Sequence, residues 1–373
     1  MPWLLEYAAG ALCVVLVLSD IFRTVLLPRP THRALRLGPI LGRSVGPLWR
    51  GLAGRMRSPR ARQTLRASLA PLLLVASILI WVAVLILGYA AMLHARSFDM
   101  QPPPGFGDAL FHAGSAFTTI GFTSVGISGP SRVTVVLAGM TGLAGVTILA
   151  TFILSVQSSL QDREVRVIQI GVITRAPPTG VALLVGIGRN DSHDRLAVVF
   201  RTWNDWAADV LQSHRANPIL MHFRSAEEDC EWLAALGAVL DAASIVLAVA
   251  DEDRMNAASS AAREFLLTGT HVLRQLAAIF RVEGGLDAAE PGSSRRCEAR
   301  ELDSVRDALA KADYAVAAGP EALDRLNRLR SAYLDDLCAL AERFDIRIER
   351  DIAARGAGRG GPLQAGSGFD PAG

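Results

Sequence analysis

The chain has 373 residues, of which 51% are hydrophobic, and the apolar excess lies in its first 157 residues. Residues 1–160 hold 13 arginines and 4 acidic residues, a net charge of +9, whereas residues 161–373 hold 25 basic and 32 acidic residues, a net charge of −7. This composition excludes an ordinary soluble globular protein and indicates a basic membrane segment followed by an acidic, soluble one.

The first predicted element is a transmembrane helix in residues 1–28. Its apolar run, Leu4–Leu27, is long enough at about 1.5 Å per residue to cross a hydrocarbon core of roughly 30 Å. Asp20 and Arg23 interrupt the run, and their i, i+3 spacing predicts that they pair on one face of the helix. Because no basic residue precedes Arg23 and no cleavage site is apparent, we expect a retained span rather than a signal peptide.

An arginine-rich loop, residues 29–68, follows with ten arginines and no acidic residue. Such a loop beside two spans marks the cytoplasmic side of a membrane. The N-terminus is then periplasmic and the acidic C-terminal half cytoplasmic. Since no aromatic-rich module surrounds the arginines, we expect no nucleic-acid partner, and contact with anionic lipid stays open.

Residues 69–157 read as a pore domain. An outer helix, 69–94, and an inner helix, 133–157, are both uncharged and long enough to span. Between them, residues 106–118 predict a half-length helix, which is too short to cross the membrane and dips into it. Backbone that leaves such a helix must line protein or water.

The segment "TTIGFT", residues 118–123, follows this half-helix. The C-terminal end of the half-helix favours a cation, and an extended strand after it would turn carbonyl oxygens inward in place of a hydration shell. A hydroxyl of Thr118 or Thr119 would add one more ring of ligands. Gly121 permits a backbone conformation that a side chain would resist. The candidate selectivity filter comprises Thr118, Thr119, Ile120, Gly121, Phe122 and Thr123.

This arrangement resembles the two-transmembrane pore unit of potassium channels, whose filter reads Thr-Val-Gly-Tyr-Gly. Residues Thr119–Phe122 match the first four filter positions, and Thr118 matches the threonine that often precedes them. Thr123 stands in place of the second glycine, and Ser124 in place of the usual aspartate. The segment is also similar to single filter segments of the Trk, Ktr and HKT potassium transporters, where the second glycine is commonly absent. The resemblance implies K⁺ at the backbone carbonyls of Thr119, Ile120, Gly121 and Phe122, with the preference for K⁺ over Na⁺ left open.

The resemblance extends over most of residues 1–250. "LSDIFRTVLLPR", "LWR" and "HRANPILMHFRS" are similar to segments of bacterial proteins described as members of a potassium channel family. It implies an all-α protein of the bacterial inner membrane with three transmembrane helices, a re-entrant pore helix and filter, and an all-helical cytoplasmic domain. It also implies that Gly142 is a candidate gating hinge. Close helix packing through Gly139, Gly142 and Gly145 is the alternative.

The cytoplasmic domain is predicted at residues 158–353, with a disordered tail at 354–373. Helices are expected at 195–214, 227–253, 258–280, 297–318 and 321–351. Trp232–Ala250 is apolar enough for a fourth span, but Asp241 at its centre favours a buried helix. "LLVGIGRND" lacks the third glycine and the flanking strands of a dinucleotide loop, so we expect no nucleotide there.

The sequence indicates passive conduction rather than catalysis. Its four cysteines and seven histidines are scattered, without the spacing of a zinc site or of a catalytic set. We expect no cofactor except permeant K⁺.

Because one filter segment cannot surround an ion, four copies must assemble into a homotetramer. An unidentified cytoplasmic ligand or protein stays open as a further partner. The alternatives are a membrane-anchored regulatory or interaction protein with a non-conducting outer loop, and a transporter subunit that needs a different partner.

Overall fold

The structure, a computed structural model, contains 11 α-helices among the residues it describes. These residues are 2–26, 49, 51, 54–56, 58, 65, 68–121, 126–174, 177–188, 192–225, 230–250, 255–280, 282, 297–314, 316, 321–346 and 348. The chain forms two compact units. Unit 1 comprises Met1–Gln161 and Gln212–Arg224, and unit 2 comprises Asp162–Leu211 and Ser225–Gly373.

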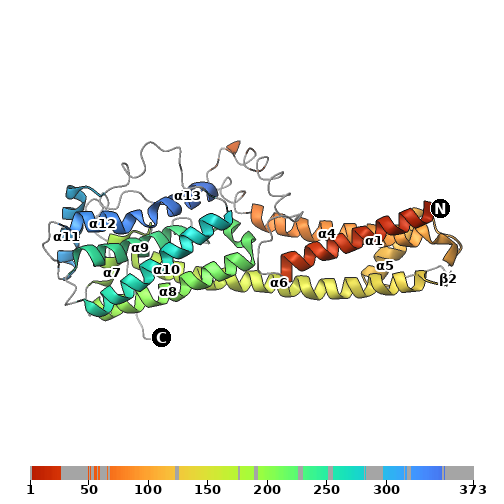
Figure 1. Cartoon of the computed structure of the whole chain (residues 1–373), viewed down its shortest axis with the longest axis horizontal. Helices are drawn as coiled ribbons and strands as arrows, with labels where there is room; N and C mark the ends of the chain where they lie inside the picture. Colours follow the sequence, from red (N-terminus) through yellow and green to blue (C-terminus); the bar gives the residue numbers. More distant parts are fainter. Residues whose placement is uncertain are drawn as a thin grey trace, which may run out of the picture. The chain divides into compact units, whose positions relative to one another are not determined.

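Among the described residues, four helices are long and apolar enough to cross a membrane: α1 (Pro2–Ile21), α4 (Leu69–Ala95), α6 (Ser131–Thr174) and α9 (Trp232–Val249). The predicted all-α membrane architecture is confirmed at this level. In unit 1, α1 is extended by a π-helical turn, η1 (Phe22–Leu26), and lies beside α4, which in turn packs against α5 (Phe106–Phe117) (Figure 1).

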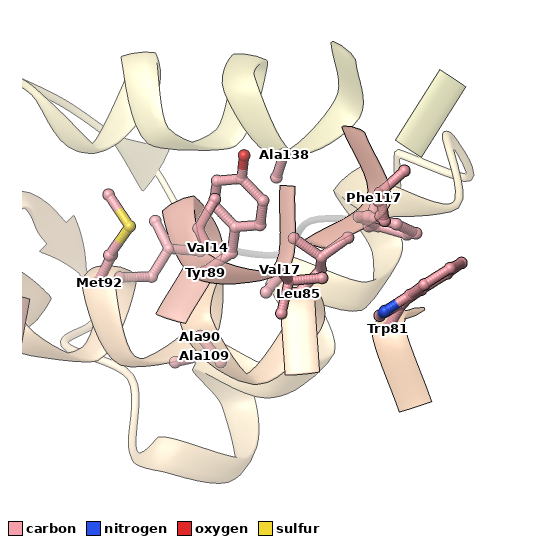
Figure 2. Close-up of a cluster of buried hydrophobic side chains, with 13 residues drawn as sticks. Val14, Val17, Trp81, Leu85, Tyr89, Ala90, Met92, Ala109, Phe117 and Ala138 are labelled. Atoms are coloured by element: carbon pink, nitrogen blue, oxygen red, sulfur yellow. The ribbon is translucent and has the colours of Figure 1, made fainter. Parts of the chain in front are cut away.

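Two glycines allow α1 and α4 to pack closely. A Cβ atom added at Gly10 would lie 2.6 Å from the carbonyl oxygen of Gly88, and one added at Gly88 would lie 2.9 Å from Cγ2 of Val14. Since real Cβ atoms do not approach other atoms within 3.0 Å, any larger residue would separate the helices. Figure 2 shows the apolar core beside this crossing, in which the hydroxyl of Tyr89 points toward the helix that carries Ala138.

The predicted ion pair between Asp20 and Arg23 is wrong. Asp20 instead accepts a hydrogen bond from Trp81 Nε1 at 2.8 Å, while its other carboxylate oxygen is buried and has no partner among the described residues. Arg23 lies in the π-helical turn with its side chain exposed. The extra residue per turn in η1 removes the shared α-helical face on which the pairing was predicted.

Helix α6 is much longer than the predicted inner helix, 133–157. It runs without interruption through 44 residues, about 66 Å. Its buried residues recur every three or four positions into the charged region, where Arg163, Val167, Ile170 and Thr174 are all buried. Charged residues are good helix formers, so the charges that end the apolar run do not end the helix; the next prolines come at Pro177 and Pro178.

A short 3₁₀ helix, η3 (Pro218–His222), belongs to unit 1 although the sequence placed it in the cytoplasmic domain. Leu220 is 1% exposed and packs with Phe152 and Val156 of α6. Leu74 of α4 and Val25 of η1 flank the same small cluster. The "HRANPILMHFRS" segment therefore packs on the end of the apolar helices of unit 1.

Unit 2 is organised around α9, whose 18 residues are all buried. This burial favours the prediction of a core helix over that of a fourth span. The remaining helices of this unit are α7 (Gly180–Ile187), α8 (Ser192–Ala216, ending in unit 1), α10 (Asn256–Phe280), α11 (Ala299–Lys311), α12 (Ala322–Ser331) and α13 (Leu334–Phe344). Helices α7, α10, α12 and α13 pack against α9, and Phe200 of α8 stacks on Phe265 of α10.

Two helices of unit 2 differ from the sequence prediction. Helix α7 was not predicted; it contains Gly186, where a Cβ would lie 2.7 Å from the carbonyl oxygen of Ile173, and its C-cap is Gly188, where a Cβ would lie 2.5 Å from Cε2 of Tyr314. The single helix predicted at 321–351 is two helices, because the backbone leaves the helical conformation at Tyr333, whose side chain is buried. The predicted tail, 354–373, lies outside the described residues.

Candidate functional site

Helix α5 lies where the sequence predicted a half-length helix, at Phe106–Phe117 instead of 106–118. It is preceded by the N-cap residue Gly105, which has an extended backbone. The N–H of Gly105 donates a hydrogen bond to the carboxylate of Asp108 at 3.3 Å. A carboxylate in the first turn also complements the positive end of the helix dipole. One face of α5, which carries Ala109 and Ala113, is buried in the core of unit 1. At 12 residues, α5 is about 18 Å long.

The residues after α5 form a helix cap. Thr119 has a left-handed backbone with φ of 60°. The N–H of Ile120 donates to the carbonyl of Ser115 at 3.0 Å, and the N–H of Thr119 donates to the carbonyl of Ala116 at 3.0 Å. These two bonds define a Schellman motif, with threonine at the position where glycine is usual. The segment is thus a turn and not the extended strand that the sequence predicted, because it satisfies the last carbonyls of α5.

Thr118 and Gly121 complete the same turn. The hydroxyl of Thr118 donates a hydrogen bond to the carbonyl of Gly114 at 2.8 Å, so in this conformation it caps the C-terminal end of α5. Gly121 has φ of +78°, and its N–H donates to the carbonyl of Ser115 at 3.3 Å. A Cβ at Gly121 would meet no atom within 4 Å, so the glycine is required by its backbone conformation and not by space.

The backbone carbonyl groups of this turn are available as hydrogen-bond acceptors or ligands. No described group donates a hydrogen bond to the backbone carbonyls of Thr119, Ile120 or Gly121. All four residues 118–121 are exposed in the single chain, including the apolar side chain of Ile120 at 60%. Phe122 and Thr123, the last two residues of the predicted filter, lie outside the described residues.

The contact of α5 with α6 fixes the depth of the turn within unit 1. Gly142 faces the end of α5, where an added Cβ would collide with the carbonyl oxygen of Phe117 and lie 2.7 Å from its carbonyl carbon. A Cβ added at Gly139 would lie 3.3 Å from the carbonyl oxygen of Ala116. Gly142 lies 11 residues after Ser131, the first residue of α6, or about 16 Å along the helix axis. The turn therefore lies about halfway along a membrane-spanning length of α6.

Tyr89 ties α4 to α6 at the same level, since its hydroxyl lies 2.7 Å from Oγ1 of Thr141. Gly142 thus lies in a tightly packed region of a continuous helix. This geometry supports the packing alternative for Gly142, and the gating hinge stays a prediction.

The loop that returns from the turn is held by Asp99. Its carboxylate accepts hydrogen bonds from Arg96 Nε at 2.8 Å and from the hydroxyl of Ser131 at 3.1 Å, and its backbone carbonyl accepts from the N–H of Ser128 at 2.9 Å. The hydrogen bond from Arg96, assisted by Ser131, holds the pKa of Asp99 below its ordinary value. Beside it, strand β1 (Met100–Gln101) pairs antiparallel with β2 (Gly126–Ile127). The two ends of the segment that contains α5 and the turn are thereby joined.

Unit 2 contains a buried ionic cluster that the sequence did not reveal. Arg330, 2% exposed, donates from Nε to Asp241 at 2.7 Å and from Nη1 to Glu301 at 3.4 Å. Burial lowers the pKa of Arg330, but the charge and hydrogen bond of Asp241, together with the nearby Tyr333 and Cys297, raise it by more and leave the pKa above its ordinary value. Burial also raises the pKa of the neighbouring Cys297 thiol to about 11. Asp241 and Arg330 are 89 residues apart, so no local pattern predicts their pairing.

Comparison of the chain with protein-family models, with curated proteins and with solved structures finds no match.

Proposed function

We propose that this chain is one subunit of a homotetrameric channel that conducts potassium, or another monovalent cation, passively across the bacterial inner membrane. The observation that carries the proposal is the turn at Thr118–Gly121, which lies at the end of a half-length helix and about halfway along a spanning length of α6, with backbone carbonyls that no described group engages. Carbonyl oxygens at such a depth are ligands of the kind that replaces the hydration shell of a cation.

The exposure of the turn in a single chain supports assembly. Unpaired carbonyls facing lipid would cost several kcal/mol each, so they require water, an ion or protein opposite them. One turn offers ligands on one side of an ion only. Four copies around an axis would place the turns opposite one another and enclose the ion.

The topology of the proposal rests on charge. The ten arginines between α1 and α4 put that loop in the cytoplasm, the N-terminus and the turn-bearing loop on the periplasmic side, and unit 2 in the cytoplasm. In this topology α1, α4 and α6 cross the membrane, and α9 is a core helix of unit 2.

The test is cation flux through liposomes that contain the purified protein, with potassium and sodium compared. Gly121→Ala should reduce flux about tenfold, because a side chain with a left-handed backbone costs about 1–2 kcal/mol. Gly107→Ala is the matched control, since a Cβ there also meets no atom within 4 Å but the residue lies in the first turn of α5. Equal leak through both variants would remove the assignment of the filter.

The competing function is a membrane-anchored regulatory or interaction protein, which the size of unit 2 favours. A purified protein that is a stable monomer and passes no cation would favour this function. A tetramer without flux would instead indicate a transporter subunit that lacks its partner.

A further inference from the structure

The part of α6 that lies in unit 2 has a second apolar face that nothing in the described chain covers. Val165, Ile168 and Val172 are 52%, 41% and 74% exposed. The opposite face of the same segment is buried. Val167 and Ile170 are each 1% exposed, and Trp206 Nε1 donates a hydrogen bond to the carbonyl of Arg163 at 3.2 Å. A helix that is apolar on both faces is stable in water only when both are buried.

Lipid does not cover this face in the topology proposed above. Val165 lies 34 residues after Ser131, about 51 Å along the helix, whereas the hydrocarbon core is about 30 Å thick. Four charged residues, Asp162, Arg163, Glu164 and Arg166, surround the start of the face and mark the aqueous side. The cover must therefore be protein.

The spacing of the exposed residues indicates which protein. Steps of three and four residues from Val165 to Ile168 to Val172 are those of the a and d positions of a coiled coil. The same steps of four and three residues continue back along α6 through exposed Gln161, Ser158 and Leu154, of which Leu154 is apolar. Isoleucine at d together with β-branched residues at a disfavours two-stranded coils and favours three or four strands.

We propose that Val165, Ile168 and Val172 form a parallel seam with the same residues of other copies of this chain, in the water just beyond the membrane. The inference rests on the proposed tetramer, because a fourfold axis brings identical segments of α6 together in parallel and in register. The seam buries the second face of α6 and gives the assembly an interface that is independent of lipid and of the turn at Thr118–Gly121.

Cysteine cross-linking in membranes tests the seam. In a parent chain with Cys13→Ser and Cys338→Ser, either Ile168→Cys or Val172→Cys is introduced, and a short bis-maleimide is added. Identical residues that face one another across a symmetry axis should shift the band on a denaturing gel from monomer to dimer. Leu267→Cys on α10 is the matched control, since Leu267 is also exposed, at 71%, but belongs to a different helix.

The outcomes separate the seam from the channel. Cross-linking at residues 168 and 172 but not at 267 supports the seam, whether or not the same preparation conducts cations. Absence of cross-linking at both seam positions, or equal cross-linking at Leu267→Cys, overturns it, even where flux that depends on Gly121 upholds the channel. As a second measurement, Val172→Asp should lower the mass of the detergent-purified assembly and Leu267→Asp should not; an unchanged mass counts against the seam.

Discussion

Gly142→Ala distinguishes the two interpretations of the central glycine of α6. The added methyl group would meet the carbonyl group of Phe117, which belongs to the backbone and cannot rotate away. The carbonyl oxygen would lie closer to the new Cβ than the carbonyl carbon does at 2.7 Å, so the end of α5 must withdraw from α6. Overpacking of this kind typically costs about 1–3 kcal/mol. The turn at Thr118–Gly121 would move with the end of α5, so we expect lower thermal stability and reduced cation flux together.

Gly145→Ala provides the control, because it lies on the same helix and a Cβ there meets no atom within 4 Å. Alanine is the better helix former, so this variant should keep or raise the thermal stability. Both variants are measured by thermal unfolding in detergent and by flux in liposomes. If Gly142→Ala unfolds at the wild-type temperature and changes only the fraction of time that the channel is open, the packing interpretation fails and the hinge interpretation gains support.

Two further predictions concern the polar clusters. Arg330→Ala should destabilise unit 2 by about 3–5 kcal/mol, because it leaves the charge of Asp241 buried without its partner. The double variant Arg330→Met with Asp241→Leu should recover most of that loss in chemical unfolding; no recovery would show that burial of charge is not the cause. For Asp99, the lowered pKa means that its contribution is complete above the ordinary carboxyl value of about 3.9 and is lost as the pH falls through the folded pKa. The backbone amides of the loop that Asp99 holds, at Ser128 and Ser131, should therefore be protected from hydrogen exchange at pH 7 and lose protection below about pH 4. The Asp99→Asn variant should not show this loss on acidification. The same loss in the variant would refute the role of Asp99.

The sequence predicted the elements whose signal is local. The bounds of α5 follow from the glycine and prolines that precede it and the apolar run that ends near Phe117. The positions of α1, α4 and the start of α6 follow from uncharged runs of spanning length. Burial of α9 follows from Asp241 and the charges at its ends. In each case the residues that decide the structure are neighbours in the chain.

Features that depend on contacts between distant segments were not predictable. Trp81 replaces Arg23 as the partner of Asp20 only because α4 packs against α1. The cap after α5 was missed because threonine at 119 carries no signal for a left-handed backbone, a conformation in which glycine is usual. The end of α6 was missed because the residues that follow the apolar run form helix as well as the run itself does.

The burial of α9 has a consequence for how the protein is made. By length and hydropathy α9 resembles a membrane span, and under the proposed topology it leaves the ribosome before α10–α13, which later cover it, have been synthesised. Asp241, near its middle, makes insertion into the bilayer less favourable by about 2.5–3.5 kcal/mol. Arg330 then neutralises the same carboxylate once the following 89 residues have emerged. In the proposed topology, one side chain thus opposes insertion of the helix into the membrane during synthesis and holds the folded unit together afterwards.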